Sequence, residues 1–215
     1  MGLLQLPRNN PNERNLKVDN LVGFTLDGHY NGTYMYEPTD VALTKCLHCG
    51  YRLDFFITDP NYTLKKTSKS LHIGKAVSGQ ADLSATYDGQ TIVSRQFRDF
   101  CLQQGYKGMQ FVDFPKDPEY FHLIVMPEVA FDPVRRGTRF EDFCSVCGNY
   151  GSVIGANPAY LQVVEPLKDG FYRSDILFGS GDNKNPLIIV GIDTKSKLRI
   201  AKLKGLVFGP AYGSG

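Results

Sequence analysis

Two copies of a short cysteine motif constrain this chain more than any other feature. They read Cys46-Leu47-His48-Cys49-Gly50 and Cys144-Ser145-Val146-Cys147-Gly148. In each motif the glycine can adopt the positive φ that lets both thiolates of one turn close on a single metal ion. Two such turns supply the four sulfurs of a tetrahedral structural site and leave no position for a reacting water. The sequence therefore predicts one structural zinc ion, with the ligands Cys46, Cys49, Cys144 and Cys147.

Other interpretations of the cysteines remain open at this level. His48 could replace a sulfur ligand, although a solvent-facing role is favoured because four thiolates are already present. Two disulfides are a second alternative. The first seven residues do not show the pattern of a secretory signal peptide, a basic start followed by a long apolar run, so we expect a cytoplasmic protein. The cytoplasm is reducing, and there paired Cys-x-x-Cys motifs indicate a metal site rather than disulfides. Iron and thiol redox chemistry are the remaining alternatives, and Cys101, which has no partner by spacing, is expected in the core.

The separation of the motifs bears on domain organisation. Because 94 residues lie between them, each motif is only half a site, and we expect a single domain over residues 1–215. Within it we distinguish a lead-in (1–40), a first half (41–143) and a second half (144–215). No stretch approaches the roughly 18 apolar residues of a membrane span, so no membrane partner is expected. The net charge of +2 gives little attraction to phosphate backbones, so no nucleic-acid partner is expected either.

Local patterns predict an α+β fold with mixed or antiparallel sheets and few short helices. A helix is expected over residues 95–104, capped by Ser94, and a second over 195–203, capped by Thr194. Residues 58–80 are expected to form mainly loop. Strands are expected at 21–24, 34–36, 53–57, 109–114, 120–126, 160–164, 187–190 and 206–208. The shared zinc-ribbon-like site with four cysteines would join these elements.

The two halves also resemble one another. Each has a cysteine motif, an apolar strand, a short capped helix and a Lys-Gly pair before a strand. Cys46 and Cys144 are 98 residues apart, and Gly108 and Gly205 are 97 apart. This agreement predicts an internal pseudo-duplication whose copies share one metal, with chance similarity of common patterns as the alternative.

Signatures of catalysis are weak. None of the four histidines, His29, His48, His72 and His122, lies in a nucleophile context. The glycines of residues 178–182 match no phosphate-binding motif and are interpreted as a tight turn. An enzyme using Cys101 or the pair Glu141 and Asp142 is the weaker alternative. We expect a protein that is not an enzyme and has no small-molecule substrate.

The densest run of charged and turn-forming residues lies at 173–184. It is interpreted either as a solvated loop with internal salt bridges, which is favoured, or as a recognition surface. Exposed aromatic side chains at Phe171, Tyr172 or Tyr212 would support recognition. The candidate partner-binding residues are Arg173, Asp175, Asp182 and Lys184.

With both cysteine motifs, the runs at 170–182 and 202–208 make the chain resemble the double-CxxCG motif family of bacterial immunity proteins. The resemblance covers most of the chain from about residue 40, and it departs from the family at Leu47 and His48, where proline is often found. It implies a non-enzymatic protein that binds a cognate toxin and neutralises it by steric occlusion. Only the four cysteines are carried over as ligands. The alternative function is a zinc-ribbon module that binds nucleic acid or associates with transcription.

Overall fold

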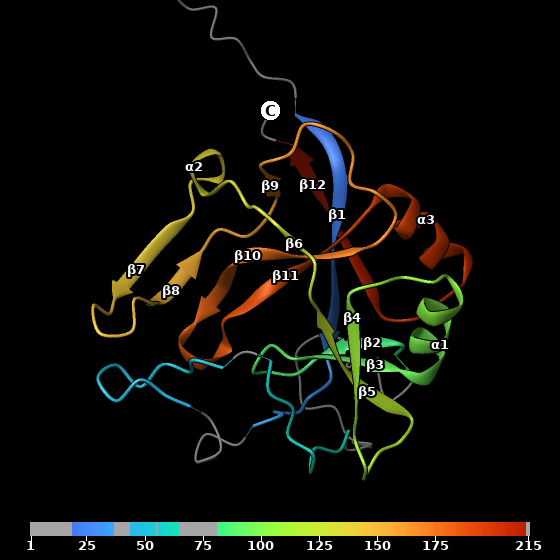
Figure 1. The fold of residues 1–215 in the computed structure, drawn as a ribbon, viewed down its shortest axis with the longest axis horizontal. Coiled ribbons are helices and arrows are strands. Elements are labelled where there is room, and N and C mark those ends of the chain that lie inside the picture. The colour runs from blue at the N-terminus through green and yellow to red at the C-terminus, as the bar shows by residue number, and fades with distance from the viewer. Residues whose placement is uncertain (1–18, 37–43, 55, 65–80, 214–215) are drawn as a thin grey trace, which may run out of the picture.

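The computed structural model describes residues 19–36, 44–54, 56–64 and 81–213 (Figure 1). Twelve strands form one mixed sheet, in which nine follow the order β4-β5-β3-β2-β1-β11-β10-β8-β7. Of the other three, β12 pairs with β1 and β9, and β6 pairs with β10. The strands are β1 (Asn20–Tyr30), β2 (Leu83–Ala85), β3 (Thr91–Ser94), β4 (Met109–Asp113), β5 (Tyr120–Val125), β6 (Glu128–Val129), β7 (Arg139–Phe143), β8 (Tyr150–Ile154), β9 (Ala159–Leu161), β10 (Phe171–Ser180), β11 (Asn185–Val190) and β12 (Leu206–Gly213).

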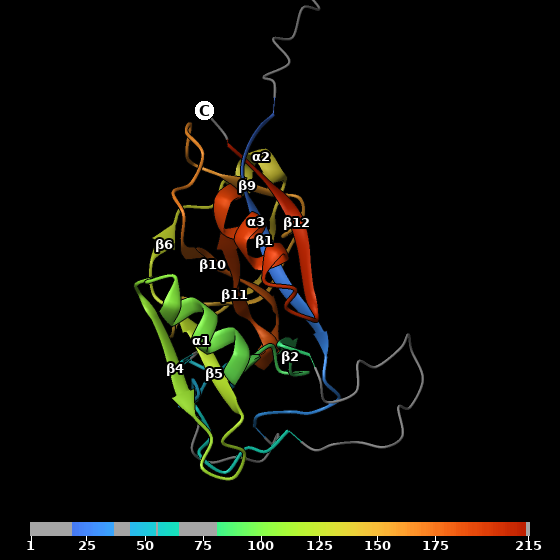
Figure 2. The ribbon, with the colours of Figure 1, turned by 90° about the vertical axis from the view of Figure 1, so that its right-hand side faces the viewer.

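Three α-helices are present in the described residues: α1 (Arg95–Gln103), α2 (Pro133–Arg136) and α3 (Ile192–Ile200). Figure 2 shows α1 and α3 on the same side of the sheet. Beneath them lies the largest apolar cluster, which includes Phe97, Cys101 and Leu198. A second cluster, around Phe131, Phe178 and Ile189, packs elsewhere on the sheet. The helices and the sheet thus share a core to which both halves of the chain contribute.

Two groups of elements have the same strand order, although the fifth strand of each occupies a different place along the chain. The first unit comprises β2, β3, α1, β4 and β5, with the strand order β2-β3-β5-β4. The second unit comprises β10, β11, α3, β12 and β1, with the order β10-β11-β1-β12. In each unit the strand between the helix-linked pair runs antiparallel to both neighbours. That strand is β5 in the first unit and β1 in the second.

The pairing registers also agree between the units. His122 of β5 pairs with Ile92 and Val112, and Thr25 of β1 pairs with Ile189 and Gly209. Ile92 of β3 and Val112 of β4 each lie 97 positions before their counterparts, Ile189 and Gly209. His122 of β5 lies 97 positions after its counterpart, Thr25. Backbone conformation follows the same spacing, since Gly105 and Lys202 both have positive φ, of 73° and 57°. The two units therefore match in backbone frame as well as in strand order.

Several expectations for local structure are confirmed. The first helix begins after Ser94, whose side-chain oxygen accepts a hydrogen bond from the backbone amide of Phe97 at 3.2 Å. Strands occupy most of residues 109–114, 120–126, 187–190 and 206–208, as expected. The strand expected at 160–164 ends at Leu161. The strand expected at 21–24 is longer, and as β1 it occupies the middle of the sheet although residues 1–40 were expected to be a lead-in.

Other expectations were wrong. Residues 34–36 form no strand, nor do the described residues of 53–57. The run expected to be loop from Arg173 to Ser180 is most of strand β10, because pairing with β11, β6 and β8 outweighs its polar composition. Thr194 lies inside α3, which starts earlier, after Gly191. Of the expected loop at 58–80, residues 65–80 lie outside the described part of the chain.

Candidate metal centre

Both cysteine motifs fold into the same turn. In the first, the amide of Cys46 donates to the Tyr51 carbonyl at 2.9 Å, and that of Gly50 donates to the Cys46 carbonyl at 2.7 Å. In the second, the corresponding bonds from Cys144 to Asn149 and from Gly148 to Cys144 are both 2.8 Å. Gly50 and Gly148 have φ values of 75° and 71°, a region that side chains disfavour. The glycines are thus required by the geometry of each turn.

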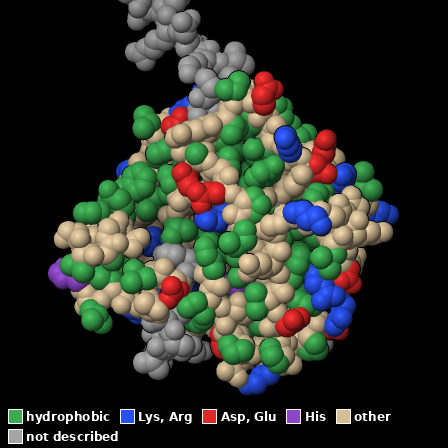
Figure 3. Space-filling model, in the orientation of Figure 1, with side chains coloured by type: hydrophobic (Ala, Val, Ile, Leu, Met, Phe, Trp, Pro, Cys, Tyr) green, Lys and Arg blue, Asp and Glu red, His purple; other side chains and the backbone are tan. Residues whose placement is uncertain are grey.

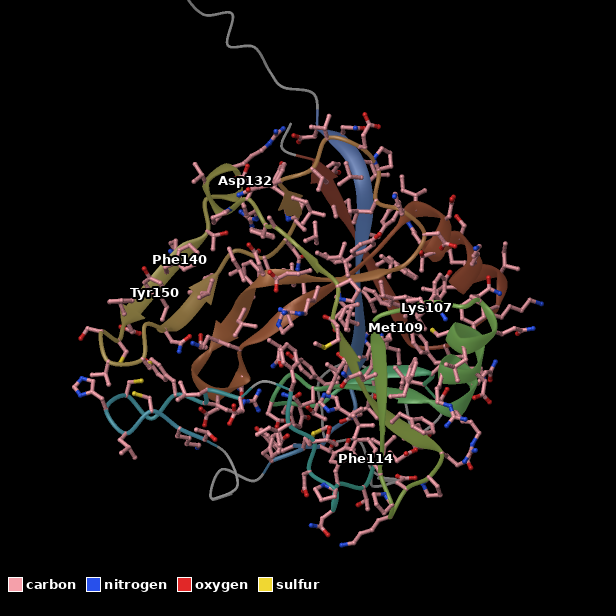
Figure 4. All side chains as sticks on the ribbon, in the orientation of Figure 1. Lys107, Met109, Phe114, Asp132, Phe140 and Tyr150 are labelled. Carbon is pink, nitrogen blue, oxygen red and sulfur yellow. The ribbon has the colours of Figure 1, made fainter. Side chains whose placement is uncertain are left out.

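The turns place four sulfurs from the two halves in one cluster. The Sγ atoms of Cys46, Cys49, Cys144 and Cys147 all lie within 4.8 Å of one another. Cys49 Sγ and Cys147 Sγ are 3.6 Å apart, close to the roughly 3.8 Å between sulfurs of a tetrahedral zinc site with bonds of about 2.3 Å. All five cysteines of the chain are free thiols. This arrangement can hold a metal ion and is consistent with a structural one. In Figure 4 sulfur atoms lie at the left, where the first motif meets the hairpin of β7 and β8.

The protonation of the four thiols shows why a cation suits this cluster. Backbone hydrogen bonding from Asn149 lowers the pKa of Cys147 to about 6, and the amides of Cys49 and His48 lower the pKa of Cys46. Burial instead raises the pKa of Cys49 to about 12, assisted by the neighbouring cysteines. The backbone favours thiolates at two positions, while crowding of sulfurs opposes a full set of four charges. A divalent cation would remove that opposition.

Two residues from the turn after β10 brace the centre. Asp182 accepts a hydrogen bond from the Arg52 amide at 3.0 Å and forms an ion pair of 2.9 Å with Lys45, so it contacts both sides of the first motif. Lys184 is 3% exposed, and its ammonium donates to the Tyr150 carbonyl and lies 5.0 Å from the centre of the Tyr51 ring. Cys147 and Cys49 favour the charged form of Lys184, although burial lowers its pKa overall. Lys184 therefore supplies a positive charge beside the sulfur cluster.

Tyr51 completes the contact between the halves. A Cβ atom at Gly151 of β8 would lie 1.9 Å from the Tyr51 hydroxyl, so only glycine permits this close approach. No sequence motif marks Tyr51, Lys184 or Gly151 as part of the site. Their roles depend on pairing between β8 and β10, which the sequence pattern does not specify.

The four candidate partner-binding residues have intramolecular roles in the structure. Arg173 forms an ion pair of 2.7 Å with Glu128, and Asp175 accepts a hydrogen bond from the Phe131 amide at 2.8 Å. Asp182 and Lys184 serve the metal centre, as described above. Phe171, expected to support recognition if exposed, is only 2% exposed and belongs to the core. A role for these residues in partner binding stays a prediction.

The remaining candidates are distributed as follows. Cys101 is fully buried in α1, and burial raises its thiol pKa, so this thiol has the properties of a core residue. The imidazole of His48 is not among the grouped ligand atoms, although its backbone amide contacts Cys46. His122 is buried in β5 with Nδ1 2.7 Å from the Thr58 hydroxyl, and burial lowers its pKa to about 4. His72 lies outside the described residues. Glu141 and Asp142 lie on the exposed strand β7, where Glu141 pairs with Arg139.

Apolar side chains are exposed around the metal-binding turns. Leu47 and Val146, at the tips of the two motifs, are 105% and 67% exposed. Phe143 is 59% exposed, and its ring packs against Tyr150, 5.0 Å away between ring centres. Figure 4 labels Phe140 and Tyr150 on this hairpin of β7 and β8, and the centroids of their rings are 5.1 Å apart.

No protein-family model matches the sequence, and neither does any curated protein. In the part of the chain that the structure describes, no helix is both long and apolar enough to cross a membrane.

Proposed function

We propose that this chain is a bacterial immunity protein that binds a cognate protein toxin and neutralises it by covering a functional surface of the toxin. The observation that carries the proposal is the four-cysteine cluster shared by the two halves, with the motif spacing on which the family resemblance rests. Such a centre serves as a rigid cross-link, because four sulfur ligands leave no coordination position for substrate. The protein would act in the cytoplasm, as a binding protein rather than an enzyme.

We propose zinc as the metal. Four thiolates in two Cys-x-x-Cys-Gly turns are a typical structural zinc set, and the 3.6 Å sulfur separation suits its bond length. Zinc would be held by Cys46, Cys49, Cys144 and Cys147, and would close a loop of about a hundred residues. Such a closure removes conformational entropy from the unfolded chain, so metal binding and folding are coupled.

We also propose that the two units derive from an internal duplication whose first strands have been exchanged. In chain order, β1 precedes the first metal-binding turn and β5 precedes the second, yet β1 pairs within the second unit and β5 within the first. A separation of 97 residues in the registers of β3, β4 and β5, at both ends of α1 and at Gly105 supports this origin. The corresponding positions of β2 and β10 are 88 residues apart, because the second hairpin is longer. The metal would then lie between equivalent turns of two copies.

The test is co-expression with the product of the adjacent upstream gene. We expect protection of the host from that toxin and a stable complex on co-purification, with an interface of about 1,200–2,000 Å². A toxin of an unrelated system is the control and should be neither bound nor neutralised. Failure to bind or neutralise any neighbouring polymorphic toxin would overturn the proposal.

The nucleic-acid alternative finds no specific support. Lys and Arg side chains mingle with Asp and Glu on the face drawn in Figure 3, rather than forming one basic patch. Nucleic-acid binding requires several phosphate contacts and a steep loss of affinity with salt. A salt titration with duplex DNA and single-stranded RNA distinguishes this alternative from toxin binding.

A further inference from the structure

A pocket lined by both polar and apolar residues opens beside the C-terminal half of strand β1. Its volume is about 180 Å³, below the roughly 300–1,000 Å³ typical of small-molecule sites, so it suits a single side chain. Thr25 and Asp27 of β1 line it, and Asn157, Asn183 and Asn185 contribute amide groups from three other positions in the chain.

Asp27 is the one charged residue among the residues that line this pocket. Its carboxylate is accessible to solvent, accepts a hydrogen bond from the Gly28 amide at 2.7 Å, and forms no ion pair within the described residues. Desolvation by the surrounding protein atoms raises its carboxyl pKa, while the hydrogen bond from the Gly28 amide and the charge of the neighbouring His29 act in the opposite direction. A negative charge held in a concave site without a cation costs free energy, which an incoming cation would recover.

The amides beside Asp27 are also available. The side chains of Asn157 and Asn183 are exposed and form no hydrogen bond to other described residues. Asn185 is already engaged, since its amide nitrogen donates to the Asp88 and Asn183 carbonyls at 3.1 and 3.2 Å. Asn157 and Asn183 could therefore offer amide oxygens to a donor that enters the pocket.

Three tyrosines extend from the rim of the pocket. Tyr30 lines it, and its ring lies 5.4 Å from that of Tyr87, which in turn lies 5.2 Å from that of Tyr34. The three residues are 61%, 44% and 50% exposed, respectively. Clustered exposed tyrosines are characteristic of protein-binding hot spots, because they bury a large area at low entropic cost. An aromatic ring beside a carboxylate also favours a planar cation.

We propose that the pocket receives an arginine side chain of a bound protein, with the guanidinium at Asp27 and the partner surface packed on Tyr30, Tyr34 and Tyr87. Arginine fits better than lysine because its fork can donate both to the carboxylate and to the amide oxygens, and its plane can stack on Tyr30. The identification of that protein as the toxin rests on the proposed function. The pocket's preference for a guanidinium does not.

The first experiment uses N-acetyl-arginine methylamide as the probe and the isotopically labelled full chain as the target. At millimolar probe, we expect NMR shift changes at Asp27, Gly28 and Tyr30, and none with the neutral citrulline analogue. Asp27→Asn should abolish the response, whereas Asp113→Asn, an exposed aspartate on β4, should retain it. An equal response to both probes, or none to arginine, means that the pocket does not recognise a guanidinium.

The second experiment measures the affinity of the same variants for the product of the adjacent upstream gene. We expect Asp27→Asn and Tyr87→Ala each to weaken binding at least tenfold. Asp113→Asn and Ile200→Ala, the latter at an exposed apolar position on α3, should bind as wild type does. If wild type binds this protein and Asp27→Asn binds equally well, the inference is wrong and the proposed function stands. If wild type does not bind it, the proposed function fails and the arginine probe alone decides the inference.

Discussion

The two units share a backbone frame but differ in what their side chains do. Cys101 of α1 and Leu198 of α3 occupy equivalent positions and are both fully buried in the same core. One turn earlier, Phe97 packs edge-to-face with Phe171, whereas the equivalent Thr194 donates a hydrogen bond to Asp169 at 2.7 Å and accepts one from the Gly170 amide. Strand register and turn conformation thus agree between the two units at positions where the packing of the side chains differs.

The hairpins of the two units differ more. In the first unit, Leu83 of β2 pairs with Val93 of β3, and in the second unit Phe171 of β10 pairs with Val190 of β11. The chain between the paired residues is nine residues longer in the second hairpin than in the first. That extension carries Asp182 and Lys184 to the metal centre. Among the described residues, this support comes from the second unit, through contacts with Lys45 and Arg52 beside the first motif and Tyr150 beside the second.

The largest expected effect tests whether the units depend on one another. Cys46→Ser and Cys147→Ser each remove one of the four sulfurs proposed to bind zinc, and structural zinc sites contribute apparent binding free energies of about 10–16 kcal/mol. We expect loss of metal by elemental analysis and loss of cooperative folding by circular dichroism. Cys101→Ala is the control and should keep its metal. A cysteine variant that retains both zinc and melting temperature contradicts a shared site.

The next prediction concerns the stability of the fold at acid pH, to which β5 and β1 should contribute differently. His122 corresponds to Thr25, so only the first unit has a buried imidazole at this position. Because its folded pKa of about 4 lies below the ordinary value of 6.5, its contribution to stability is complete above pH 6.5 and falls as the pH drops toward 4. The loss is on the order of 3 kcal/mol.

Copying the second unit's residue, in His122→Thr, should flatten that pH dependence even if it lowers stability at every pH. Denaturant unfolding at several pH values from 7.5 to 4 measures it, and metal release affects both proteins alike. Parallel stability curves for wild type and variant would show that His122 is not responsible.

A smaller effect is expected from the additional residues of the second hairpin. Lys184→Met removes the buried cation beside the sulfurs, and we expect zinc affinity to fall about 10- to 100-fold, as for other residues that support metal ligands. Competition with a chelator measures this. Lys168→Met, at an exposed lysine, should leave the affinity unchanged. Equal affinities in both variants would show that the ammonium does not stabilise the centre.

The smallest effect distinguishes the two helix starts. Ser94→Ala removes the side-chain cap of α1 and should cost about 1 kcal/mol of unfolding free energy. At the equivalent position of α3, Gly191→Ser should also destabilise, since its Cβ would lie 2.3 Å from the Lys168 carbonyl oxygen. Urea unfolding measures both variants. If Gly191→Ser is more stable than wild type, the close approach to Lys168 does not limit this position, and α3 lacks only a side-chain cap.

The sequence could predict the features that depend on local spacing. The cysteine motifs specify two turns, and Ser94 followed by apolar residues at helical spacing specifies α1. The partner of a strand is not local information. Nothing in residues 20–30 indicates pairing with strands that lie 162 to 193 positions later in the chain. The polar run in β10 likewise resembles a loop until its neighbouring strands are known. For the same reason, burial of Lys184 could not be inferred from composition.

The crossing of β1 and β5 also gives the molecule an order of synthesis. β5 follows β3 and β4 closely, so the first unit can complete its sheet while the ribosome is still translating the chain. β1, the earliest strand described, meets its main partners only when β11 and β12 emerge. An apolar strand that waits so long is exposed to aggregation, so rapid release or chaperone binding would benefit the nascent protein.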